Sequence, residues 1–65
     1  MKLNTQKIEK ELKRLGWTRA DLARVLNVKR QAVYIFLAQD TLPRLSTLEK
    51  YARALGVDPK DLIKG

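Results

Sequence analysis

The sequence has 65 residues and a formal net charge of +7, from 14 Lys and Arg against 7 Asp and Glu. We expect one domain over residues 1–65, since a chain this short buries only about 60% of its unfolded surface. Cysteine and histidine are both absent. Their absence excludes disulfides, thiolate and imidazole ligands for a metal, and the two side chains most often used as nucleophile and base. We therefore expect no enzyme activity, no catalytic residue, no metal and no cofactor. The charge favours a polyanionic partner, above all nucleic acid.

The chain contains no segment that looks like a membrane anchor or a leader. Residues 1–6 lack the apolar stretch of about 7 to 15 residues that a signal peptide needs. The apolar run at residues 33–38 is far too short to span a bilayer. We expect a cytoplasmic protein without a membrane partner, although a basic surface also serves solubility alone or attraction to anionic lipid.

A first helix is predicted between Asn4, a good N-cap, and Gly16, which favours a left-handed stop. Apolar residues recur inside it at i, i+4 and i+7, as Ile8, Leu12 and Leu15. This spacing predicts one buried stripe.

A second helix is predicted to begin at Thr18, with Asp21 three residues later in the position of a capping box. Asn27 follows it where a turn requires positive φ, which asparagine tolerates better than most residues. Its buried face is formed by Leu22, Ala23 and Leu26.

The segment 28–39 is ambiguous by local propensity. Its residues 33–37 are β-branched, aromatic or leucine and resemble a strand. A strand needs a partner for its backbone groups, and every other segment is helical, so we predict a helix here as well.

Two more helices are predicted after Pro43, which breaks the chain. The fourth ends at Gly56, and a short fifth begins at Asp58 with Pro59 in the favoured first position. The apolar positions of the fourth are Leu45, Leu48, Ala52 and Leu55. The predicted fold class is all-α, a compact bundle of five helices.

The second and third helices have the spacing of a helix-turn-helix over residues 18–38. Residues 8–62 resemble the helix-turn-helix family of phage Cro and repressor proteins. The pieces that carry the resemblance are Gly16-Trp17-Thr18, Asp21-Leu22-Ala23, Asn27-Val28, Val33, the proline before the fourth helix, and Ala52-Arg53-Ala54-Leu55-Gly56-Val57. The resemblance implies a lambda-repressor-like DNA-binding domain without a small-molecule ligand.

Two positions depart from the family pattern. Members commonly carry an arginine four residues before the glycine and a glutamate late in the recognition helix, where this chain has Leu12 and Leu37. Replacing both members of a buried ion pair by apolar residues is often neutral or stabilising. We predict that the two leucines touch.

The resemblance places the recognition helix, about residues 29–38, in the major groove. We expect Arg30 to pair with guanine and Gln31 with adenine. Tyr34 either bonds DNA or covers the helix. Ile35 either packs on a thymine methyl or flanks the core.

Phosphate contacts are expected at the start of the second helix, where free amides near Thr18 and Arg19 and the helix dipole favour an anion. Lys29 and Arg44 are expected to flank the same face. The loop 40–42 has no basic residue and one acidic residue, which predicts a weaker affinity than that of a more basic relative.

The predicted function is that of a small Cro-like transcriptional repressor which binds a palindromic operator in double-stranded DNA as a homodimer. The resemblance points to residues 41–44, with Leu62 and Ile63, as the dimer interface, but for Leu62 itself we expect a place in the core of its own chain. The alternative is a protein-interaction module of the antitoxin or antirepressor kind, suggested by Tyr34, Ile35 and Leu37. An exposed apolar patch on the third helix would favour it.

Overall fold

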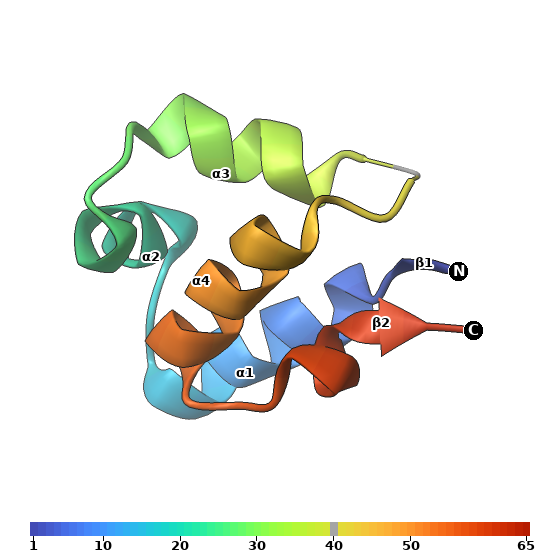
Figure 1. Ribbon diagram of the computed structural model, residues 1–65. Coiled ribbons are helices and arrows are strands. Elements are labelled where there is room, and N and C mark those ends of the chain that lie inside the picture. Colours follow the sequence, from blue (N-terminus) through green and yellow to red (C-terminus); the bar gives the residue numbers. More distant parts are fainter. Residues whose placement is uncertain (40) are drawn as a thin grey trace.

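The computed structural model describes residues 1–39 and 41–65, which form helices and one small pair of strands. Figure 1 shows α3 lying across one side of α4, with α1 on the other side and the two chain ends next to each other. The α-helices are α1 (Thr5–Leu15), α2 (Arg19–Leu26), α3 (Arg30–Leu37) and α4 (Leu45–Leu55). The remaining elements are the 3-10 helix η1 (Pro59–Leu62) and the strands β1 (Lys2–Leu3) and β2 (Ile63–Lys64).

The all-α class is confirmed for four α-helices, but the prediction of a fifth is wrong. Asp58 caps the segment as expected, accepting a hydrogen bond from the Lys60 N–H at 2.9 Å, yet the segment is a single 3-10 turn of 4 residues. It stops because Ile63 is extended, with φ −109° and ψ 131°, and enters a strand. Short 3-10 turns of this length are common connectors.

The strand pair was not predicted from the sequence. It is antiparallel, with Lys2 opposite Lys64 and Leu3 opposite Ile63, and the Asn4 N–H donates to the Leu62 carbonyl at 2.7 Å. These bonds join the two ends of the chain and place Leu3 in the core, where it is 6% exposed.

The predicted helix ends are confirmed. Gly16, Asn27 and Gly56 all adopt positive φ, at 71°, 58° and 74°, and each follows the last residue of a helix. Asn4 caps α1 by accepting a hydrogen bond from the Lys7 N–H at 3.1 Å. The ambiguous third segment is helical, as predicted.

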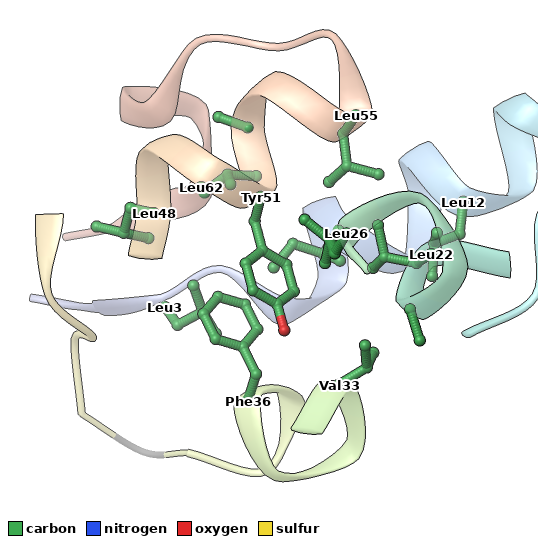
Figure 2. Close-up of a cluster of buried hydrophobic side chains, with 13 residues drawn as sticks. Leu3, Leu12, Leu22, Leu26, Val33, Phe36, Leu48, Tyr51, Leu55 and Leu62 are labelled. Atoms are coloured by element: carbon green, nitrogen blue, oxygen red, sulfur yellow. The ribbon is translucent and has the colours of Figure 1, made fainter. Parts of the chain in front are cut away.

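The core lies between α4 and the other helices, and Figure 2 shows its side chains converging from all of them. Phe36 of α3 and Tyr51 of α4 stack at its centre, with ring centroids 3.7 Å apart and an interplanar angle of 11°. Burial raises the pKa of Tyr51. Tyr51, which is 5% exposed, was not among the apolar positions predicted for α4, whereas Leu45, which has the expected helical spacing, is 64% exposed.

Two further predictions concern leucines. Leu62 is completely buried and belongs to the core of its own chain, as expected, so it is not available to a dimer interface. Leu12 is a core residue, and Leu37 is partly buried and packs against the core. Their direct contact stays a prediction.

A buried carboxylate ties α1 to α4. Glu11 is 7% exposed and pairs with Lys7 at 3.3 Å and with Arg14 at 2.7 Å. The Arg14 hydrogen bond, with a smaller contribution from Lys7, lowers the pKa of Glu11. Arg14 also donates to the Leu55 carbonyl at 3.5 Å, so the cluster fixes the end of α4.

Asp40, on which part of the prediction for the loop 40–42 rests, lies outside the described residues. Among the residues that are described, no helix combines the length and apolar character needed to cross a bilayer.

Candidate nucleic-acid interface

The helix-turn-helix consists of α2 and α3, which pack closely on each other. The turn is short because Asn27 takes a left-handed conformation directly after α2 and Lys29 is already the N-cap of α3. Val33 and Phe36 hold α3 on the core, with exposures of 0% and 4%. The opposite side of α3 is therefore free to meet a partner.

The four predicted base readers lie together on this free side. Arg30, Gln31, Tyr34 and Ile35 are all exposed. Residues four apart on a helix are surface neighbours, so Arg30 lies next to Tyr34 and Gln31 next to Ile35. Since Ile35 is 64% exposed and Tyr34 44%, both side chains are accessible.

The amino end of α3 is open and basic. Lys29 makes no side-chain capping bond, and the first turn contains no acidic residue. Within the described part of the chain, no carboxylate pairs with Lys29 or Arg30. The unbonded amides of a helix start and its dipole attract anions, and here two free cations add to that attraction.

The amino end of α2 is capped by its own side chains, which corrects the expectation that the Thr18 amide is free. The Thr18 N–H donates to the Asp21 carboxylate at 2.8 Å, and the Thr18 hydroxyl accepts from the Asp21 N–H at 3.2 Å. The predicted capping box is thus confirmed, but the Thr18 amide is not free for a phosphate. The hydrogen bond from the Thr18 backbone is the largest cause of the lowered pKa of Asp21.

Arg19 is the best connected of the predicted phosphate contacts. Its guanidinium pairs with Glu9 of α1 and lies 5.5 Å from the ring centroid of Tyr34 of α3. The side chain remains 43% exposed. Sequence reasoning missed Glu9, since no local spacing connects residues on three different helices.

Arg44 stands at the start of α4 in the same situation as Lys29. It is exposed, it is the N-cap of α4 without a side-chain capping bond, and no acidic residue follows in the first turn. A second open and basic helix start is therefore available for a phosphate.

Apart from Met1, the large apolar side chains that are exposed lie in two places. Tyr34 and Ile35 lie on α3, while Val25 and Leu45 line an open groove of about 740 Å³ between α2 and α4. Leu37 is partly buried against the core, so it adds little to an apolar surface on α3.

Geometry and charge thus define the class: a helix-turn-helix whose second helix presents polar and basic side chains. The chain belongs to the helix-turn-helix family, because a sequence model of that family matches residues 8–62. This is the family of Cro and repressor proteins that the sequence resembles. No curated protein and no solved structure matched the chain. Membership supports a DNA-binding transcription regulator and gives no support to the protein-interaction alternative.

Proposed function

We propose that this protein is a small Cro-like repressor which binds its operator with α3 in the major groove. The observation that carries the proposal is the first turn of α3, where Lys29, Arg30 and Gln31 are exposed at an uncapped helix start. In a helix-turn-helix these are the positions that reach base edges.

The exposed residues of α3 differ in the chemistry they offer to DNA. Arg30 has the paired donors that match guanine O6 and N7, and Gln31 offers the donor and acceptor that match adenine. Tyr34 and Ile35, one turn further along, would meet the next base pairs, with Ile35 against a thymine methyl.

Phosphates would be held at three helix starts. Lys29 and Arg44 are exposed cations at the uncapped ends of α3 and α4, and neither pairs with a carboxylate among the described residues. At α2 the Thr18 hydroxyl still has its hydrogen to donate. Arg19 uses one guanidinium nitrogen on Glu9, and because a guanidinium has five donors, others remain for a phosphate.

We further propose that two copies bind a palindrome, since one recognition helix reads too few base pairs for useful specificity. The half-sites would be spaced by about 10 base pairs. With Leu62 assigned to the core, residues 41–44 and the partly buried Ile63 are the parts of the expected interface that remain available.

The test is DNA binding across a salt series, after selection of a preferred site from random duplexes. The logarithm of the binding constant should fall linearly with the logarithm of salt concentration. Arg30→Ala and Gln31→Ala should each lose about 1 to 3 kcal/mol on the selected site, with the loss confined to particular base pairs.

Arg53→Ala is the matched control, because Arg53 is an exposed cation on α4, outside the proposed interface. It should affect all sequences alike and only slightly. Wild-type protein that shows no salt-dependent binding to duplex DNA would contradict the proposal.

A further inference from the structure

The contact between Arg19, Glu9 and Tyr34 is unusual in joining three helices through one exposed guanidinium. Arg19 is the first residue of α2, Glu9 lies in the middle of α1, and Tyr34 lies on the free side of α3. Both charged side chains are about half exposed, at 43% and 52%. The core does not require this arrangement.

Arg19 restricts the Tyr34 ring from one side. A cation over an aromatic face is attracted by the ring quadrupole. Here the guanidinium lies 5.5 Å from the ring centroid. A phenol side chain on an exposed helix face otherwise samples several rotamers, so the contact selects among them.

Glu9 in turn orients Arg19. Its carboxylate accepts a hydrogen bond from an Arg19 terminal nitrogen, and an Arg–carboxylate pair constrains the plane of the guanidinium. The same Glu9 carboxylate adds a negative charge near the proposed DNA surface, where electrostatics alone would disfavour an acid.

We propose that Glu9 and Arg19 are positioning residues for Tyr34, so that α1 and α2 determine how α3 reads the base pair nearest that ring. Glu9 holds Arg19, Arg19 holds the ring, and the ring edge and hydroxyl face the groove in one orientation. This inference rests on the proposed function. It assigns Arg19 an effect on sequence preference in addition to its affinity for phosphate.

The two roles of Arg19 predict different patterns. A phosphate contact alone weakens binding to every sequence equally and lowers the salt slope by about one. A positioning role changes discrimination at the base pair that Tyr34 reads and leaves the other positions unchanged. For Glu9, charge alone predicts a uniform gain in affinity when the carboxylate is removed.

The experiment measures binding to the selected site and to all its single-base variants for wild type, Glu9→Gln, Arg19→Ala and Tyr34→Leu. Arg24→Ala and Glu49→Gln are matched controls. Both residues are exposed, and these substitutions remove the same charges as Arg19→Ala and Glu9→Gln but elsewhere, on α2 and α4. The expected result is that Glu9→Gln, Arg19→Ala and Tyr34→Leu each lower the discrimination between bases at the same base pair by roughly two- to fivefold. The controls change all positions equally.

Two further measurements complete the test. The double variant Arg19→Ala with Tyr34→Leu should discriminate at that base pair no worse than Tyr34→Leu alone, because coupled residues are not additive. In the protein without DNA, the NMR shifts of the Tyr34 ring should move in Glu9→Gln and Arg19→Ala and stay fixed in both controls.

Uniform changes across all base pairs in Glu9→Gln and Arg19→Ala would overturn the inference, as would an unchanged Tyr34 ring in both variants. Those outcomes leave the proposed function standing if wild type binds DNA. The proposed function itself would be contradicted by a different result, namely wild-type protein that does not bind duplex DNA at any salt concentration.

Discussion

The first turns of α2 and α3 belong to the same motif and are built in opposite ways. At α2, Thr18 and Asp21 satisfy each other in a complete capping box. At α3, Lys29 gives no cap and no acid follows. A cap contributes roughly 0.5 to 2 kcal/mol of stability, so α3 forgoes a stabilisation that α2 uses. Under the proposed function, the start of α3 is left without a cap so that a DNA phosphate can bind there.

Lys29→Asp breaks this difference most strongly. It places a carboxylate at the N-cap, where it can accept hydrogen bonds from the first backbone N–H groups of α3. We therefore expect the free energy of unfolding to rise by about 0.5 to 1 kcal/mol. DNA affinity should fall at least about tenfold, because a phosphate contact is lost and a like charge replaces it. Chemical denaturation and the salt series measure the two effects. Unchanged DNA affinity would contradict the assignment of Lys29.

Thr18→Ala removes the cap of α2 in return. The free energy of unfolding should fall by about 1 kcal/mol, measured by denaturation with urea. Thr18→Ser is the control, since it retains the accepting hydroxyl and should stay close to wild type. Equal loss in both variants would show that the methyl group, and not the cap, is what stabilises the helix.

The Asp21 carboxylate makes the α2 cap sensitive to pH. Its pKa is lowered from the ordinary 3.8 by the Thr18 hydrogen bonds, so its stabilisation is complete above that value and is lost as pH falls below it. The stability difference between wild type and Asp21→Asn should therefore be largest near neutral pH and shrink as the pH falls below 3.8 and through the lowered pKa of Asp21. A difference that grows on acidification would refute this sign.

Ile35→Ala should have the smallest effect on stability. The side chain is 64% exposed, so we expect a change within about 0.5 kcal/mol in the free energy of unfolding. Discrimination for thymine at one base pair should weaken, because a methyl contact is lost. A loss of stability well above this range, with unchanged DNA preference, would favour the interpretation of Ile35 as a flank of the core.

Local chemistry made most of α2 and α3 predictable. Gly16 and Asn27 end α1 and α2 because they adopt positive φ at low cost. Thr18 and Asp21 form the N-terminal cap of α2 within four residues of chain. The exposure of Arg30 and Gln31 follows from Val33 and Phe36 facing the core at helical spacing. Each of these inferences needs only near neighbours in the sequence.

Other features required the packed chain. The exposure of Leu45 could not be predicted, since helical spacing alone does not say whether another element covers the first residue of a helix. Tyr51 enters the core because Phe36, fifteen positions earlier, offers it a stacking surface at 3.7 Å.

The sequence by itself determined where the four α-helices begin and end and which side of α3 is free, since caps and apolar periodicity act over a few residues. Tertiary structure decided how the chain ends meet and how Arg19 is used. The pairing of β1 with β2 ends η1 after one turn, and Glu9 and Tyr34 meet Arg19 from separate helices. Contacts between distant residues depend on how the elements pack, and no local pattern in the chain encodes them.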